Sequence, residues 1–192
     1  MHGPFWIETD RLLIRPWEPR DDAGFREMVG DPEMMRYISG GMPWDEERIA
    51  EFHARQRRHL ASHGCCMGAL VERASGGLAG VCGLQPLRVS SDVEVGWWVA
   101  KRLWGRGLAT EGGGAALRFA WEKLGLRRVK AIAEPENRAS LRVMEKLGLR
   151  FERRATGREL GLRLSPDLDL VVYGIERPPP APPAPSAPPI GA

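Results

Sequence analysis

The chain has 192 residues, 43% of them hydrophobic and 28% charged, which suits one domain with a sizeable core and is too short for two ordinary domains. The net charge of +3 includes arginines spread through every segment, so we expect no direct nucleic-acid binding. Residues 1–10 lack the apolar stretch of a signal peptide and no run approaches the length of a bilayer span, so we expect a cytoplasmic protein without a membrane partner.

The cysteines are three, Cys65, Cys66 and Cys82, and they show no C-x-x-C spacing. An odd number without this spacing argues against a disulfide framework and against a zinc site. We therefore expect the three cysteines to act as small buried hydrophobic residues and to bind no metal. Cys82 is a candidate to lie near a reactive ligand.

Apolar spacing and cap residues predict the order of the elements. We expect a strand at 11–15, helices from Pro19 to about Val29 and from Asp45 to about residue 60, and a hairpin of strands 65–73 and 78–87. An alternating strand at 93–100, a helix that stops at Gly125, a strand at 129–133, a helix at 137–147 and a last strand at 168–176 follow, with a loop after Phe151.

The C-terminal segment differs from the rest in composition. Residues 178–192 hold eight prolines, separated only by Ala, Ser, Gly and Ile. Such a run cannot form a helix or a sheet ladder, so we expect a disordered or polyproline-II tail. The sequence therefore predicts one α/β domain at 1–177 and a tail at 178–192.

The middle of the chain reads as a βαβ unit. The strand at 93–100, the following helix and the strand at 129–133 predict two parallel strands joined by a right-handed crossover, with a ligand at their carboxyl ends. Gly112, Gly113 and Gly114 conflict with the helix, because each costs roughly 1 kcal/mol relative to Ala. Either the helix starts late, or the backbone needs close contact with the sheet or a ligand.

The corner of this unit is the glycine-rich stretch Trp104–Glu111. Glycines allow a ligand to approach the backbone, and the free amides of a helix N-terminus favour an anion such as phosphate. A P-loop would need Lys-Ser or Lys-Thr after Gly107, where the chain has Leu-Ala. A dinucleotide fingerprint would need glycine at Thr110 and an acid ending a second strand, where the chain has Glu122 in a helix.

The corner resembles the acyl-CoA loop of the GCN5-related N-acetyltransferases, the GNAT family, whose pattern is Gln/Arg-x-x-Gly-x-Gly/Ala. Trp104 departs from the first position, but Trp-Gly-x-Gly-x-Ala-Thr-Glu is similar to the ribosomal-protein N-acetyltransferase branch. The segment Asn137–Gly148 resembles the N-x-x-S…E-K-L-G segment of the same branch. The resemblance covers about residues 9–177 and implies a GNAT-like mixed, partly splayed β-sheet flanked by helices in a single domain.

The resemblance also implies where acetyl-CoA, the cosubstrate, would bind: between the strand at 93–100 and the strand at 129–133. In this family the backbone of the corner holds the pyrophosphate, and main-chain groups of the preceding strand hold the pantetheine. Asn137 is both a candidate cofactor contact and, by chemistry alone, a good helix N-cap. The cofactor-binding residues implied are Val99, Arg106, Gly107, Leu108, Ala109, Thr110 and Asn137.

Two residues are candidates for catalysis. Glu94 shares a strand face with Gly96 and Trp98, in the strand that leads into the corner, and is a candidate general base, although a solvated carboxylate paired with arginine explains it comparably well. The resemblance places Ser140 near the sulfur, where it could protonate the leaving thiolate. Many relatives use a tyrosine at the position of Met144, so the acid is either Ser140 or water. Asp92, Glu134 and Glu136 remain alternative bases.

The resemblance implies direct transfer of an acetyl group to a primary amine. A lysine has a pKa of about 10.4 and an α-amine about 7.8, so lysine costs roughly 3.5 kcal/mol more to deprotonate at neutral pH. A site with one glutamate and no tyrosine therefore suits an α-amine, such as that of a ribosomal or other protein. A catalytically silent acetyl-CoA sensor or scaffold, or an enzyme for small-molecule amines, stays open, as does a monomer or a homodimer.

Overall fold

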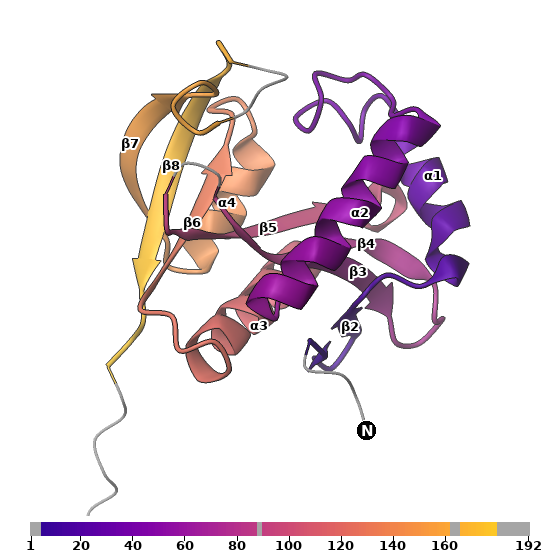
Figure 1. The fold of residues 1–192 in the computed structure, drawn as a ribbon, viewed down its shortest axis with the longest axis horizontal. Coiled ribbons are helices and arrows are strands. Elements are labelled where there is room, and N and C mark those ends of the chain that lie inside the picture. The colour runs from indigo at the N-terminus through magenta and orange to yellow at the C-terminus, as the bar shows by residue number, and fades with distance from the viewer. Residues whose placement is uncertain (1–4, 88–89, 162–165, 180–192) are drawn as a thin grey trace, which may run out of the picture.

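The computed structural model describes residues 5–87, 90–161 and 166–179 (Figure 1). None of the described helices is both long enough and apolar enough to cross a bilayer. Residues 180–192, most of the predicted tail, lie outside the described residues. The elements in chain order are β1 (Ile7–Glu8), β2 (Leu12–Arg15), the 3-10 turn η1 (Pro19–Asp21), α1 (Asp22–Gly30), α2 (Glu46–His63), β3 (Met67–Glu72), β4 (Leu78–Pro86), β5 (Val93–Val99), the 3-10 turn η2 (Lys101–Leu103), α3 (Leu108–Glu122), β6 (Arg128–Ala133), α4 (Arg138–Lys146), β7 (Arg150–Thr156) and β8 (Asp169–Glu176).

The strands form one mixed sheet in the order β1-β2-β3-β4-β5-β6-β8-β7. β5 and β6 are parallel, and the other neighbouring strands are antiparallel. Within the described chain, β5 and β6 pair only where Glu94 lies opposite Lys130, and beyond that point the two strands diverge (Figure 1). The predicted parallel βαβ unit and the mixed, partly splayed sheet are therefore confirmed.

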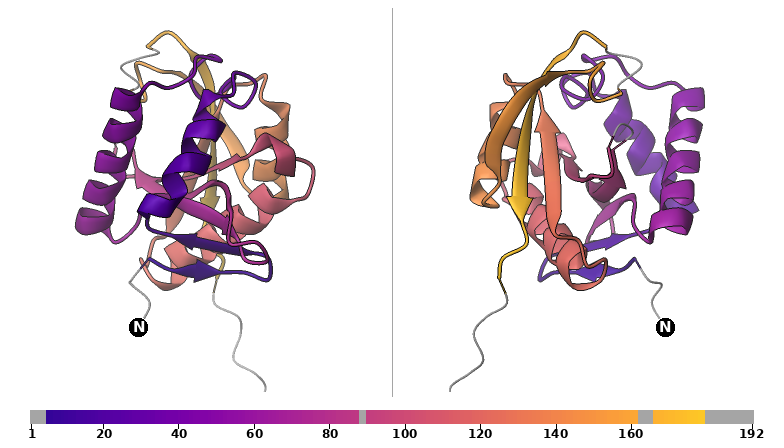
Figure 2. Two further views of the ribbon diagram at one scale, coloured as in Figure 1. Left: turned by 90° about the vertical axis from the view of Figure 1, so that its right-hand side faces the viewer. Right: turned by 60° about the vertical axis from the view of Figure 1, so that its left-hand side comes forward.

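Helices cover both faces of the sheet (Figure 2). α3 packs against β4 and β5, and its apolar residues share the largest core cluster with Val95. α1 and α2 lie on the opposite face, where Trp98 stacks near Phe52 of α2. Because side chains alternate along a strand, Glu94 and Gly96 face the same way as Trp98, toward α1 and α2.

Both predicted helix stops are present. Gly125 takes the left-handed conformation with φ +65°, and the amide of Leu126 folds back to the carbonyl of Ala120 at 3.0 Å. Gly148, with φ +83°, ends α4 in the same conformation. A residue with a Cβ is strained at such angles, so glycine is the residue that lets each helix stop within one turn.

The three consecutive glycines lie inside α3, so the helix does not start late. A Cβ on Gly113 would lie 2.9 Å from Leu147 of α4 and 3.1 Å from the Trp97 ring, and one on Gly112 would lie 3.2 Å from the Cys82 sulfur. Close packing against the sheet and α4 therefore explains glycine at these two positions.

The sequence did not predict two of the strands. Residues 150–156, expected to begin a loop after Phe151, form β7 and pair with β8 at the sheet edge, so that expectation is wrong. The two-residue β1 pairs with β2 at the opposite edge. The remaining helices and strands occupy the predicted segments to within a few residues.

Candidate active site

A cavity of about 580 Å³ opens where β5 and β6 diverge. Its walls include Glu94, Gly96 and Trp98 from one face of β5 and Trp97 and Val99 from the other. The cavity therefore reaches both sides of the sheet through the gap between the two strands.

We distinguish two sides of this cavity. The corner side is formed by the glycine corner and by α4: Leu103, Trp104, Gly105, Gly107, Leu108, Ala109, Thr110, Asn137, Ala139, Ser140, Arg142, Val143, Met144 and Lys146. The α1 side is formed by the segment after α1 and by three strands: Glu33, Met34, Arg36, Tyr37, Ile38, Met67, Gln85, Glu94, Gly96 and Trp98.

The glycine corner is held against the N-terminal strands. Glu111, in the first turn of α3, accepts hydrogen bonds from the Thr9 hydroxyl at 2.5 Å and from Nε of Arg11 at 2.6 Å. Arg11 also donates to the carbonyl of Arg106 at 3.0 Å. Gly107, with φ +77°, precedes α3 and has no side chain to cap it. Since the first amides of a helix lack acceptors within the helix, this corner can hold an anion.

The structure brings most of the predicted corner residues to the cavity. Residues 107–110 line it, whereas Arg106 does not. The Arg106 guanidinium instead pairs with the Glu72 carboxylate at 3.0 Å, on the side toward β3. Arg106 thus holds the corner in place, and its expected backbone contact with pyrophosphate stays a prediction.

Val99 lines the cavity, but its carbonyl already has a donor. The indole N–H of Trp104 lies 2.6 Å from that oxygen. The next amide, of Ala100, donates to the carbonyl of Ala79 in β4, so the alternation of backbone groups turns the Val99 carbonyl toward the β6 side. Sequence reasoning treated Trp104 as a motif variant and missed this contact, which an indole donor in need of an acceptor could have suggested.

The N-terminus of α4 faces the same cavity. The Asn137 side chain accepts a hydrogen bond from the backbone amide of Ser140 at 3.1 Å, so the predicted N-cap is present. Asn137, Ser140 and Met144 all line the cavity. The cap fixes where α4 begins, and this places the Ser140 hydroxyl on the corner side.

Glu94 lies on the α1 side of the cavity beside Gln85. The two residues are opposite each other in the β4–β5 register, and Nε2 of Gln85 donates to the Glu94 carboxylate at 2.8 Å. Burial raises the pKa of Glu94 to about 7, and the hydrogen bond from Gln85 acts in the opposite direction. A carboxylate with this pKa can accept a proton and release it near neutral pH. The sequence pointed to Glu94 but not to Gln85.

The other carboxylates considered from the sequence are placed differently. Asp92 pairs with Lys130 at 2.5 Å, and this hydrogen bond is the main reason that its pKa is lowered. Burial raises the pKa of Glu134, but neither Glu134 nor Glu136 lines the cavity. Glu33 does line the cavity and pairs with Lys101 at 2.5 Å. Glu94 is therefore the cavity carboxylate without a cationic partner among the described residues.

Cys82 does not take the role considered for it. Its side chain is 0% exposed, lies beside Gly112 of α3, and is absent from the cavity wall. Burial raises the pKa of its thiol to about 12, so the reactive thiolate is not populated at neutral pH.

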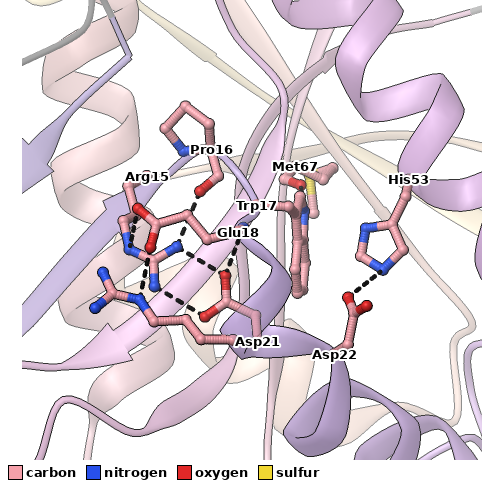
Figure 3. Close-up of polar contacts among 9 residues, drawn as sticks. Arg15, Pro16, Trp17, Glu18, Asp21, Asp22, His53 and Met67 are labelled. Carbon is pink, nitrogen blue, oxygen red and sulfur yellow. Dashed lines mark hydrogen bonds and ion pairs between the residues drawn. The ribbon is translucent and has the colours of Figure 1, made fainter.

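A buried ion pair lies at the start of the segment that leads into α1 (Figure 3). Arg15 donates to both carboxylate oxygens of Asp21, at 2.7 and 2.8 Å, and the two side chains are 1% and 4% exposed. The Trp17 indole donates to the carbonyl of Met67 at 2.8 Å. These contacts fix the segment before α1 to β2 and β3, and so position Met67 at the cavity wall.

Comparison with known proteins identifies the family. The model of the acetyltransferase (GNAT) domain matches residues 11–150, most of the chain. The uncharacterized protein YkkB of Bacillus subtilis is 30% identical over 80% of this chain and 90% of its own length. The crystal structure of a GNAT-family acetyltransferase from Bacillus anthracis superposes with a TM-score of 0.74 at 26% identity, over 90% of this chain and 98% of that one.

A third similarity concerns the fold alone. The ribosomal L7/L12 alpha-N-protein acetyltransferase RimL, solved in complex with coenzyme A, superposes with a TM-score of 0.72 at 15% identity, over 89% of this chain and 97% of that one. The matched family model spans the glycine corner and the Asn137 segment that carry the resemblance in the sequence. The chain belongs to the GNAT acetyltransferase family and is an N-acetyltransferase.

Proposed function

We propose that this enzyme transfers the acetyl group of acetyl-CoA directly to the α-amino group of a peptide or protein. The observation that carries the proposal is Glu94: a carboxylate with a pKa of about 7, on the wall of a cavity whose other side is the glycine corner. Acetyl-CoA supplies an activated acyl group with a thiol as leaving group. The family membership supports the cosubstrate, and RimL is described as an alpha-N-protein acetyltransferase.

The corner side of the cavity suits the cosubstrate. The amides of residues 107–110 would hold its pyrophosphate, since they open a helix without a capping side chain. Val99 would contact the pantetheine through its main chain, after the Trp104 indole gives up or shares the carbonyl. Asn137, at the start of α4, would also contact the cosubstrate.

In this mechanism Glu94 accepts a proton from the substrate ammonium, which frees the nitrogen lone pair. The nitrogen bonds to the thioester carbonyl carbon, and the carbon–sulfur bond then breaks. The nitrogen then loses its second proton, which passes through the Ser140 hydroxyl, or a water, to the departing sulfur. An α-amine suits a base of this strength, because about one in seven α-amines is already neutral at pH 7, against about one in 2,500 lysines.

The test is the pH dependence of acetyl transfer to a peptide α-amine. Glu94→Gln should lower turnover at pH 7 by about 10²–10⁴-fold while the affinity for acetyl-CoA is retained. The parent rate should rise with an apparent pKa near 7, and high pH should largely rescue the variant. Glu134→Gln serves as the matched control, since that carboxylate does not line the cavity and the variant should keep the parental rate. Unchanged turnover of Glu94→Gln at pH 7 would contradict the assignment.

A further inference from the structure

The α1 side of the cavity combines an apolar and aromatic wall with the polar side chains of Glu33, Arg36, Gln85 and Glu94. Three apolar residues of its wall come from the segment after α1 and from β3: Met34, Ile38 and Met67. They share one aromatic and methionine-rich core cluster or pack against it. A group that carries an amine to Glu94 can lie against this wall.

The floor beside Glu94 is formed by Gly96, Met67 and Trp98. The Trp98 ring is held edge-on by Trp44, with centroids 5.6 Å apart at 87°. Between Glu94 and Trp98 lies Gly96, where a Cβ would come within 2.8 Å of the Met67 methyl group. Residues two apart on one face of a strand are separated by about 6.5 Å. A group attached next to an amine at Glu94 would thus lie against Met67, which covers Gly96, and a longer group would reach toward Trp98.

Tyr37 forms a further part of the wall on the α1 side. Its hydroxyl donates to the carbonyl of Glu136, 99 residues away in sequence, at 3.3 Å. The Arg36 guanidinium lies over the Tyr37 ring, 5.3 Å from its centroid. These two contacts link the segment after α1 to the segment before α4, and they hold the Tyr37 ring at the cavity wall.

Besides Glu94, two charged side chains line this side, and only one of them is in an ion pair within the described part of the chain. The Glu33 carboxylate pairs with Lys101 at 2.5 Å, and the Arg36 guanidinium covers an aromatic ring. A cationic side chain next to the amine would lose hydration without a new partner, since Glu33 is already paired, and an acidic one would meet only the solvent-exposed Arg36. An apolar side chain would gain from the transfer out of water.

We infer that the α1 side selects primary amines whose α-carbon bears a large apolar or aromatic side chain, with Tyr37 and Trp98 as specificity-determining residues. For a peptide acceptor, this means an N-terminal residue such as methionine, leucine or phenylalanine. The inference rests on the proposed function, since it names the class of substrate for the same site.

A panel of matched peptides tests the inference on the parent enzyme. The peptides differ only in the first residue, Met, Leu, Phe, Ser, Asp or Lys, and have an amidated C-terminus; free phenylalanine is added to reveal recognition of a carboxylate by Arg36. We expect kcat/KM to be on the order of ten- to a hundred-fold higher for the three apolar peptides than for the three polar ones. Equal rates, or a preference for Ser, Asp, Lys or the free amino acid, would overturn the inference and leave the proposed function standing. Acetylation of no peptide would overturn both.

Two variants of Tyr37 separate the ring from the hydroxyl. Tyr37→Ala should reduce the preference for the Phe peptide at least several-fold, chiefly through KM, with acetyl-CoA affinity retained. Tyr37→Phe keeps the ring and should keep the preference. Met42→Ala is the control from the same segment, because Met42 is 63% exposed and lies outside the cavity wall. A preference that survives Tyr37→Ala would show that Tyr37 does not determine specificity.

Discussion

The hydrogen bond between Gln85 and Glu94 tunes the base that the proposed reaction needs. It is one of the two influences on the pKa of Glu94, and it opposes the larger influence of burial. Gln85→Leu keeps a similar volume but removes the donor. A hydrogen bond to a charged group contributes about 1.5–3 kcal/mol, and one pH unit corresponds to about 1.4 kcal/mol. The apparent pKa of the pH–rate profile should therefore rise by about one to two units.

Full pH profiles of kcat and kcat/KM check this expectation. A purely structural role for Gln85 would change the rate at every pH by the same factor and leave the apparent pKa in place. If the Gln85→Leu profile overlies the parent profile after scaling, Gln85 does not tune the pKa of Glu94.

The sequence identified residues whose position depends only on their own strand. It missed residues whose contacts depend on a neighbouring strand or segment. Glu94 could be found because strand alternation places it on a known face. Gln85 could not, because its partner depends on the register of β4 against β5. Tyr37 reaches Glu136 across 99 residues, and no local pattern records a contact of that kind.

Among the elements, α3 carries glycines with opposite expected effects. Gly113→Ala places a Cβ 2.9 Å from Leu147 and 3.1 Å from the Trp97 ring, so neighbours must move. Gly114→Ala meets nothing closer than 3.4 Å, at Leu147, and gains helix propensity of up to about 1 kcal/mol. We expect Gly114→Ala to raise, and Gly113→Ala to lower, the free energy of unfolding.

Urea titration of the two variants measures the difference directly. The pair is matched in composition and helix propensity, so a difference between them reports packing alone. Equal stability of the two proteins would show that α3 has room to shift away from α4.

Elements with strong apolar patterns and explicit stops were predictable, and edge strands were not. Gly125 and Gly148 mark helix ends by their chemistry, and the structure confirms both. β7, by contrast, exposes its first five residues, Arg150–Arg154, so it lacks the alternation that predicts a strand. Only pairing with β8 makes the segment a strand, and that pairing is a tertiary event.

For the whole molecule, the raised pKa of Glu94 links the site to stability. A carboxyl whose folded pKa is about 7, against 4.5 ordinarily, binds its proton more tightly in the folded state. The folded state is then favoured at low pH, and this contribution is lost as pH rises from about 4.5 to about 7. The shift corresponds to at most about 3 kcal/mol, less because the side chain is only partly buried.

Glu94→Gln should therefore unfold at a higher temperature than the parent at pH 8, where the parent holds a buried charge. The difference should shrink toward pH 5, where the parental carboxyl is protonated. Calorimetry at both pH values, without acetyl-CoA, provides the measurement. A variant less stable than the parent at pH 8 would mean that the carboxylate is better solvated than its burial indicates.

The splay of the sheet also belongs to the whole molecule. Its position could be anticipated only through the family resemblance, since strand alternation does not say where two parallel strands part. In the structure the strands meet at Glu94 and Lys130 and then diverge, and the cavity fills the gap.

The contact between Trp104 and Val99 has a consequence for the order of events in time. A ligand that seeks the Val99 carbonyl competes with a side chain already bound to that oxygen at 2.6 Å. Where a ligand must wait for such a group to leave, its association rate stops rising with concentration and levels off at the rate at which the group departs. The departure of the indole would then limit the rate of cosubstrate binding at high cosubstrate concentration.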